Sequence, residues 1–232
     1  MDLSIIIPYK SDGDLRNKHI EFTLKRYKEM FPEAQIIVSE DEKNDKKSWE
    51  TFNKSKIINK GFKQVNNNNI FITDIDMIFE KESIEKSLKI INKYSCIVPF
   101  TTIYKLYKGI STQVLENGLN KKEINKENCN SYHSKRRTSG CILLESSNFT
   151  LVNGYDERFI GWGAEDTAFV IAVTTITGKY AHRLIGESWH LWHRKGSNSQ
   201  EENTRQLYSR YLEAKGNKKE MEKLIKEVGH NA

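Results

Sequence analysis

At 232 residues and 27.0 kDa, the chain is long enough to bury a large core without a disulfide or metal staple. Hydrophobic residues make up 37% and charged residues 29%, as in soluble globular proteins. The three widely spaced cysteines exclude a disulfide framework and a CxxC metal pair, and we expect a reducing, cytoplasmic compartment. The opening residues lack a basic region and a long apolar run, and no stretch approaches roughly 20 apolar residues, so we expect neither a signal peptide nor a membrane span. The net charge of +6 either favours an anionic ligand or merely reflects a lysine-rich composition.

The first hundred residues alternate between short apolar runs and segments with helical periodicity. Isoleucine-rich runs predict buried strands, and apolar positions three or four residues apart predict helices between them. The predicted elements are a strand at 3–8, a helix through 20–31 ended by Pro32, a strand at 34–38, a helix at 47–60 closed by Gly61, a strand at 70–73, a helix through 84–91 and a strand at 96–100. This order predicts βαβ units and a parallel sheet with both faces covered.

The second half has a weaker pattern. Residues 105–135 are polar and weakly periodic, which predicts a loop or excursion. A buried helix through 169–178 and one or two strands in 180–192 follow, and the helical tail after residue 207 is broken near Gly216. Because no repeat or linker is visible, we expect one α/β domain over 1–232 with a mixed sheet.

Two aspartates, Asp74 and Asp76, follow the apolar strand at 70–73 directly. Ionised carboxylates beside a core are costly unless a cation pairs with them, and ligands gather at the carboxyl ends of strands in open α/β sheets. A hard divalent ion that bridges carboxylate and diphosphate satisfies both conditions. The alternative is that Asp74 caps a turn and Asp76 is merely solvated.

The segment Gly161–Asp166 places a tryptophan between two glycines, ahead of an acidic pair. The acidic pair is explained either by the dipole of the following helix or by a general base, and Trp162 is a candidate stacking platform on a hinged loop. His190 and His193 form a third cluster. They can share one ion only if the backbone turns between them, because residues three apart on a strand face opposite sides.

Five segments in order resemble the β1,4-galactosyltransferase-like glycosyltransferases, a metal-dependent, inverting family with the GT-A fold. Residues 52–62 (FNKSKIINKGF) closely follow the family's Phe-Asn-Arg-Ala-Lys-Leu-Leu-Asn-Val-Gly-Phe helix. The others are the strand at 5–9, the Asp74–Asp76 sequence, the Asn153–Tyr155 turn and the Gly161–Asp166 segment. The resemblance implies a Rossmann-like, mostly parallel mixed sheet with flanking helices. Residues 1–100 would bind the nucleotide sugar, 101–200 would hold the acceptor and catalytic groups, and 201–232 would form a helical tail.

The resemblance also implies roles for matched residues. Asp76, His193 and His190 would hold Mn²⁺ or Mg²⁺, and Asp166 would be the catalytic base. Glu165 would contact the acceptor or the donor beside it. A UDP-sugar carrying Gal, GalNAc, Glc or GlcNAc would be the donor, and the residues around it would be Pro8, Tyr9, Lys10, Phe52, Lys54, Asp74, Trp162 on a lid loop, and Gly163.

Three departures from the family pattern concern specificity. Thr167 replaces an acidic residue, which predicts a different acceptor mode from the family's usual GlcNAc. Arg137 replaces the aromatic residue that tunes the donor sugar, and it could reach a phosphate or an acidic acceptor. Lys10 replaces an arginine after the opening strand. The sequence shows no counterpart of the family's membrane stem, so we expect a soluble enzyme of a bacterium or of a phage-infected cell.

The acceptor stays open among a glycan, which we favour, a peptide and a hydroxylated base of phage DNA. The basic run at 134–137 is the argument for DNA, since phosphate contacts supply most non-specific affinity. Two other functions stay open as well. One is another metal-dependent nucleotide enzyme such as a nucleotidyltransferase, and the other is a non-catalytic sugar- or nucleic-acid-binding protein with the same fold.

Overall fold

The computed structural model describes residues 1–11, 13–40, 52–133, 140–161, 163–194 and 201–228. Its strands are β1 (Ser4–Tyr9), β2 (Gln35–Glu40), β3 (Asn69–Thr73), β4 (Met77–Phe79), β5 (Cys96–Val98), β6 (Thr102–Leu106), β7 (Cys129–His133), β8 (Cys141–Glu145), β9 (Ala181–Arg183) and β10 (Glu187–His190). Its helices are α1 (Asp14–Met30), α2 (Lys54–Phe62), α3 (Lys81–Leu88), α4 (Lys108–Asn117), α5 (Ser146–Leu151), α6 (Glu165–Thr177), α7 (Glu201–Ala214) and α8 (Lys218–Lys226), with short 3₁₀ turns at Ile91–Lys93 and Lys121–Glu123.

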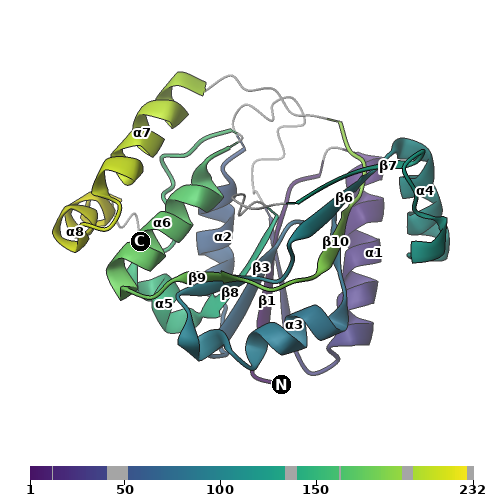
Figure 1. Ribbon diagram of the computed structural model, residues 1–232, viewed down its shortest axis with the longest axis horizontal. Helices are drawn as coiled ribbons and strands as arrows, with labels where there is room; N and C mark the ends of the chain where they lie inside the picture. The colour runs from purple at the N-terminus through teal and green to yellow at the C-terminus, as the bar shows by residue number, and fades with distance from the viewer. Residues whose placement is uncertain (12, 41–51, 134–139, 162, 195–200, 229–232) are drawn as a thin grey trace.

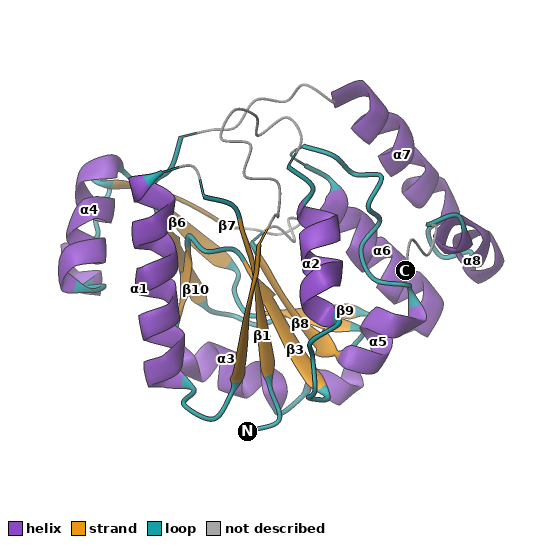
Figure 2. Cartoon of the chain, turned by 180° about the vertical axis from the view of Figure 1, so that it is seen from behind, coloured by secondary structure: helices purple, strands orange, loops and turns teal. Residues whose placement is uncertain are grey.

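A six-stranded sheet in the order β2-β1-β3-β8-β5-β9 forms the centre of the molecule (Figure 1). β1 pairs in parallel with β2 and β3, β8 runs antiparallel to β3 and β5, and β9 is parallel to β5. Ile5 and Ile7 point to the layer that contains α1 and α3, whereas Ile6 points to the layer that contains α2, α5 and α6 (Figure 2). Helices therefore cover both faces, and the predicted α/β fold is confirmed.

The second sheet, in the order β4-β10-β6-β7, corrects the prediction of a loop at 105–135. β6, α4 and β7 lie in or overlap that range, and α4 packs Ile110 and Val114 against Trp189 of β10. The segment is polar because only one side of this small layer is buried, so few of its positions need apolar residues.

Several other boundaries differ from the predictions. α2 begins at Lys54 and contains Gly61, which was predicted to end the helix; residues 47–51 lie outside the described part of the chain. A Cβ on Gly61 would lie 2.8 Å from Ile6 Cγ2, so this glycine serves close helix–sheet packing. α3 ends at Leu88, and β4, β8 and α5 had not been predicted as separate elements.

Helices α7 and α8 cover the outer side of α6, a placement that the sequence did not predict (Figure 1). The predicted break between them near Gly216 is confirmed. Leu207, Tyr211 and Met221 join the same apolar core as α6. The Tyr211 hydroxyl donates to the buried Asp156 carboxylate at 2.9 Å, which links the tail to the loop before α6. Within the described residues, no helix is both long enough and apolar enough to cross a bilayer.

Candidate active site

The candidate site lies at one edge of the central sheet, where β1 and β3 end and where α2 and α6 begin (Figure 1). Ile6 of β1 is level with Ile72 of β3, so Pro8 and Asp74 each follow two residues beyond the last paired position. The Asp74 N–H donates to the Gly140 carbonyl at 2.9 Å, which fixes the turn after β3. This is the edge at which open α/β sheets bind their ligands.

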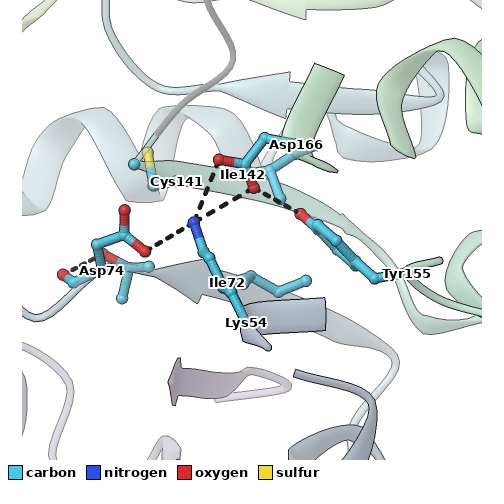
Figure 3. A pocket seen from close by; sticks show the side chains of 9 residues that line it. Lys54, Ile72, Asp74, Cys141, Ile142, Tyr155 and Asp166 are labelled. Carbon is cyan, nitrogen blue, oxygen red and sulfur yellow. Dashed lines mark hydrogen bonds and ion pairs between the residues drawn. The ribbon is translucent and has the colours of Figure 1, made fainter. Parts of the chain in front are cut away.

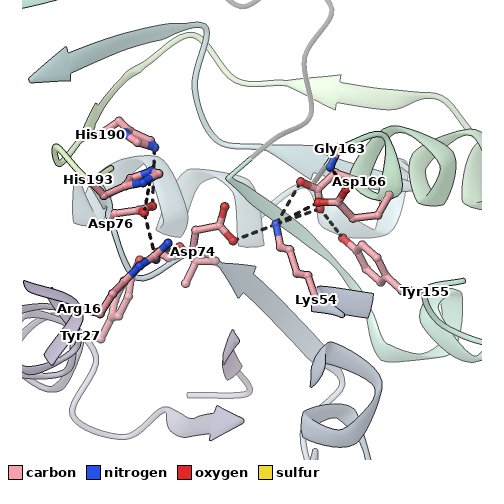
Figure 4. Close-up of polar contacts among 12 residues, drawn as sticks. Arg16, Tyr27, Lys54, Asp74, Asp76, Tyr155, Gly163, Asp166, His190 and His193 are labelled. Atoms are coloured by element: carbon pink, nitrogen blue, oxygen red, sulfur yellow. Dashed lines mark hydrogen bonds and ion pairs between the residues drawn. The ribbon is translucent and has the colours of Figure 1, made fainter. Parts of the chain in front are cut away.

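Lys54, the first residue of α2, contacts carboxylates from two distant segments (Figure 4). Its Nζ lies 2.9 Å from Asp74 Oδ1, 3.2 Å from Asp166 Oδ2 and 3.8 Å from Glu165 Oε1. The Tyr155 hydroxyl donates to the other oxygen of Asp166 at 3.3 Å. One lysine thus joins the aspartate that follows β3 to the acidic pair of α6, and we call these four charged residues the lysine cluster.

Burial and mutual charge both act on this cluster. Burial alone would lower the pKa of Lys54, but Asp166, Asp74 and Glu165 raise it well above its ordinary value, so the ammonium stays charged. Burial, followed by the charge of Asp166, raises the pKa of Glu165 to about 7. Burial also raises the pKa of Asp74, against the lowering effect of Lys54. The cluster thus holds more acid groups than its single cation balances, and Glu165 is the carboxyl with a half-protonation point near neutral pH.

The motif at 52–62 and the turn at 153–155 are hydrogen-bonded to each other. The Asn59 side chain donates to the Tyr155 carbonyl at 2.8 Å and accepts from the Tyr155 N–H at 2.9 Å. Gly154 has a φ of +72°, and a Cβ there would lie 2.5 Å from Asn59 Oδ1. Asn53 caps α2 by accepting from the Lys56 N–H at 2.8 Å. These contacts hold Lys54 and Tyr155 on either side of Asp166.

The start of α6 is built from unusual backbone. Gly163 and Ala164 have φ values of +115° and +68°, and the Gly163 N–H donates to Glu165 Oε2 at 3.1 Å. The Gly161 N–H donates to the Phe52 carbonyl at 2.9 Å, so this loop also meets the start of α2. Glu165 and Asp166 occupy the first turn, where the helix dipole favours acidic residues. The same placement directs the Asp166 carboxylate at Lys54. Stabilisation by the helix dipole and a catalytic role for Asp166 are therefore compatible.

A second cluster surrounds Asp76 (Figure 4). His190 Nε2 lies 3.8 Å from its Oδ1, and His193 Nε2 lies 3.4 Å from its Oδ2. One ligand atom from each of these three residues lies within 4.8 Å of the other two. The backbone turns as the histidine pair required, because β10 ends at His190 and the Leu191 N–H donates to the Asp76 carbonyl at 2.8 Å.

The chemistry of this second cluster fits a divalent cation. His193 Nδ1 lies 2.7 Å from the Arg194 carbonyl, which can only accept, so Nδ1 carries the hydrogen. With Nδ1 bonded in this way, Nε2 faces a carboxylate oxygen, and a cation between the two atoms would be bound by both. Burial raises the pKa of Asp76, but His190, Arg16 and His193 lower it far below its ordinary value, so the carboxylate is ionised.

A shallow depression lies beside the lysine cluster (Figure 3). The residues that line it come from α2, from the ends of β3 and β8, from the 153–155 turn and from α6: Lys54, Ile72, Thr73, Asp74, Gly140, Cys141, Ile142, Tyr155 and Asp166. Charged and polar side chains therefore line it together with residues of β3 and β8.

The structure brings most of the predicted site residues to this edge. Pro8, Tyr9 and Lys10 are buried where β1 ends. Arg137 and Trp162 lie outside the described residues. Sequence reasoning missed Tyr155 and also missed Arg16, whose Nη1 lies 3.3 Å from Asp76 Oδ2. Arg16 lies one turn before Ile20 on the buried side of α1, and a charged residue at such a position was the available signal.

Comparison with known proteins gives both a sequence match and structural matches. Residues 121–185 match a family model described as the N-terminal domain of galactosyltransferase, a range that includes the 153–155 turn and the acidic pair. No curated protein sequence matches the chain. The catalytic domain of Drosophila β1,4-galactosyltransferase 7, in complex with xylobiose, is 18% identical, with 88% of this chain and 79% of that chain covered and a TM-score of 0.51.

Two further solved structures share the fold. A point variant of the same Drosophila enzyme, in complex with manganese, UDP-Gal and xylobiose, is 16% identical over 88% of this chain and 79% of that chain, with a TM-score of 0.50. Glucosyl-3-phosphoglycerate synthase from Mycobacterium tuberculosis, with Mn²⁺, UDP and phosphoglyceric acid, is 11% identical over 93% and 78%, with a TM-score of 0.54. The chain therefore has a GT-A-like glycosyltransferase fold, and the resemblance to the galactosyltransferases predicted from its motifs is confirmed.

Proposed function

We propose that this protein is a metal-dependent glycosyltransferase that moves a hexose from a UDP-sugar to an acceptor hydroxyl with inversion at the anomeric carbon. The observation that carries the proposal is the adjacency of the two clusters. Asp76, His190 and His193 would form a cation site. Asp74, two residues before Asp76, belongs to the lysine cluster. A leaving diphosphate and an incoming hydroxyl each have chemically suitable neighbours at one edge of the sheet.

Asp166 is the proposed general base. Its carboxylate is held from one side by Lys54 and from the other by the Tyr155 hydroxyl, which leaves little rotational freedom. A carboxylate fixed in this way at a helix start can accept the acceptor's proton as its oxygen attacks the anomeric carbon and the bond to the UDP oxygen breaks. One displacement of this kind inverts the anomeric centre.

Asp76, His190 and His193 would hold Mn²⁺ or Mg²⁺. A carboxylate with two imidazoles is a suitable ligand set for Mn²⁺, and three protein ligands leave positions for a diphosphate. When bound, such an ion would neutralise charge on the leaving diphosphate. Arg16 balances Asp76 from the side of α1. Two of the similar structures were solved with manganese and UDP or UDP-Gal, which supports this donor class.

A glycan is the acceptor class we propose. The similar Drosophila structures are complexes with xylobiose, a disaccharide, whereas the basic run that suggested DNA lies outside the described residues. Tyr9, Lys10, Phe52 and Lys54 would contact the nucleotide sugar, because they lie where β1 ends and α2 begins. The hexose itself, with Gal, GalNAc, Glc and GlcNAc as candidates, is left to experiment.

The test is UDP release from a panel of UDP-hexoses by the purified protein with Mn²⁺, with EDTA, and in Asp76→Ala. Glu116→Ala, which removes an exposed carboxylate on α4, is the matched control. We expect slow release from one sugar that requires Mn²⁺, persists in Glu116→Ala and disappears in Asp76→Ala. Pyrophosphate release from a nucleoside triphosphate would instead identify a nucleotidyltransferase. Absence of both activities, with no donor-induced thermal shift, would leave a non-catalytic protein.

A further inference from the structure

One face of α1 binds the segment that carries the two aspartates, through a row of polar side chains. Arg16 contacts Asp76, the Thr23 hydroxyl donates to the Ile75 carbonyl at 2.7 Å, and the Tyr27 hydroxyl lies 3.3 Å from Thr73 Oγ1. These residues are seven and four positions apart, so they lie on one side of the helix. The row therefore follows the chain from Thr73 to Asp76.

His19 belongs to this row, but its ring has no hydrogen-bond partner among the residues that the structure describes. It is three residues after Arg16 and four before Thr23, which places it on the same side of α1. His19 is fully buried, with 0% of its surface exposed, and neither Nδ1 nor Nε2 makes a hydrogen bond within the described part of the chain. A buried polar group without a partner destabilises a protein, so such a group calls for an explanation.

The surroundings of His19 point to the cation site. The charges that act on its pKa are those of Asp76, Arg16, His193 and His190, all members of the second cluster or in contact with it. Burial is the largest effect and lowers the pKa of His19 to about 4, so the ring is neutral at pH 7 and offers one donor and one acceptor. His19 does not belong to the group whose ligand atoms converge, so it is not placed to touch an ion held there.

We propose that His19 is a positioning residue for the cation site, which acts on the ion through Asp76 or through a water bound beside it. Groups that orient metal ligands by hydrogen bonding commonly change metal affinity by about 10–100-fold when they are removed. A neutral buried imidazole that is idle in the ion-free protein and hydrogen-bonded in the loaded one would couple α1 to ion binding. The inference rests on the proposed cation site but not on any particular donor or acceptor.

The test measures the dissociation constant of Mn²⁺ for the full chain, from the electron paramagnetic resonance signal of free Mn²⁺. We compare wild type, His19→Phe, His19→Gln and the control His182→Phe. His182 stacks on Tyr94 with ring centroids 4.4 Å apart on the edge strand β9, so the control removes an imidazole far from the row. Each variant is also melted in EDTA.

We expect His19→Phe to weaken Mn²⁺ binding about 10–100-fold while its Tm in EDTA stays equal or rises, since an unpartnered polar ring has been replaced by an apolar one. His19→Gln should bind Mn²⁺ with intermediate affinity, and His182→Phe like wild type. An unchanged affinity in His19→Phe overturns the inference, and if that variant does not fold, an unchanged affinity in His19→Gln does so. Wild type that binds Mn²⁺ but releases no UDP overturns the proposed function alone, whereas failure of wild type to bind Mn²⁺ overturns the cation site and this inference together.

Discussion

Asp74 and Asp76 lie one residue apart and belong to different charge clusters: Asp74 Oδ1 is 2.9 Å from Lys54 Nζ, whereas Asp76 Oδ2 is 3.3 Å from Arg16 Nη1. The pair is therefore not a single bidentate ligand. One aspartate connects the turn to α2 and α6, and the other connects it to α1 and β10. A substitution at either position should change a distinct property, with Asp76 governing cation affinity and Asp74 governing the charge on the lysine cluster.

The role of Asp166 is tested by Asp166→Asn, which keeps the shape and the Tyr155 contact but removes the basic carboxylate. We expect transfer to fall about 10²–10⁴-fold, the usual contribution of a positioned base, while the donor-induced thermal shift is retained. The measurement is single-turnover transfer from the UDP-hexose that the donor panel identifies to a glycan acceptor. Wild-type rates in this variant would show that another group takes the proton.

The lysine cluster is tested by Lys54→Met. Loss of its cation leaves Asp74, Glu165 and Asp166 without a counter-charge from the described residues, and breaking a buried ion pair costs about 3–5 kcal/mol of unfolding free energy. The carboxyl pKa values of the folded variant then exceed those of the unfolded chain, so the folded state binds extra protons and its stability falls as pH rises from about 4.

The loss in Lys54→Met should therefore be larger at pH 8 than at pH 5, as measured by denaturant unfolding at both values. Lys60→Met removes an exposed lysine from the same helix and should change stability by less than about 0.5 kcal/mol. Equal losses at the two pH values would mean that Lys54 contributes packing rather than charge.

Glu165 provides a second pH test, because burial raises its pKa to about 7. The unfolded glutamate titrates near 4.3, so between these values the folded state holds a proton that the unfolded chain releases, and stability falls as pH rises through this window. Glu165→Gln removes this dependence and can still accept from the Gly163 N–H. Relative to wild type, its unfolding free energy should gain about 2–3 kcal/mol between pH 5 and pH 8. A constant difference across that range would contradict the raised pKa.

Gly61 and Gly109 form a matched pair for the packing of α2. A Cβ at Gly61 would meet Ile6 Cγ2 at 2.8 Å and Ser39 Cβ at 3.1 Å, whereas one at Gly109 of α4 would meet nothing within 4 Å. Gly61→Ala should destabilise the protein by about 1–3 kcal/mol because the added methyl group overpacks the contact. Gly109→Ala should stabilise it by about 0.4–1 kcal/mol because alanine lowers the conformational entropy of the unfolded chain. Equal effects of the two substitutions in urea unfolding would refute the close contact between α2 and β1.

The first half of the fold could be predicted from sequence because its strands are buried on both faces and read as unbroken apolar runs. The runs at 3–8 and 70–73 match β1 and β3 closely, and the helix predicted through 169–178 matches α6. The polar segment at 105–135 could not be predicted, since the small second sheet and α4 bury few side chains. Gly61 was misassigned because a glycine that permits close approach and a glycine that ends a helix look alike in a single sequence.

The site was predictable where several groups of one chemistry adjoin in sequence, as in Asp74 with Asp76 and His190 with His193. The contacts of Lys54 were not predictable, because Asp74 and Asp166 reach it from distant segments and a lone lysine in a helix carries no signal of its partners. His19 and Arg16 were missed for the same reason. Both are polar residues on the buried side of α1. Their importance becomes clear only when the structure shows that this side of the helix packs against residues 73–76.

The contact between Tyr211 and Asp156 sets an order of events during synthesis of the chain. The core around α6 includes Leu207, Met221 and Leu224, so the outer side of α6 stays exposed until α7 and α8 have left the ribosome. Asp166 begins α6, so α7 and α8 complete the packing of the helix that carries it. A nascent chain arrested before residue 201 would present the apolar outer side of α6 to solvent and to chaperones.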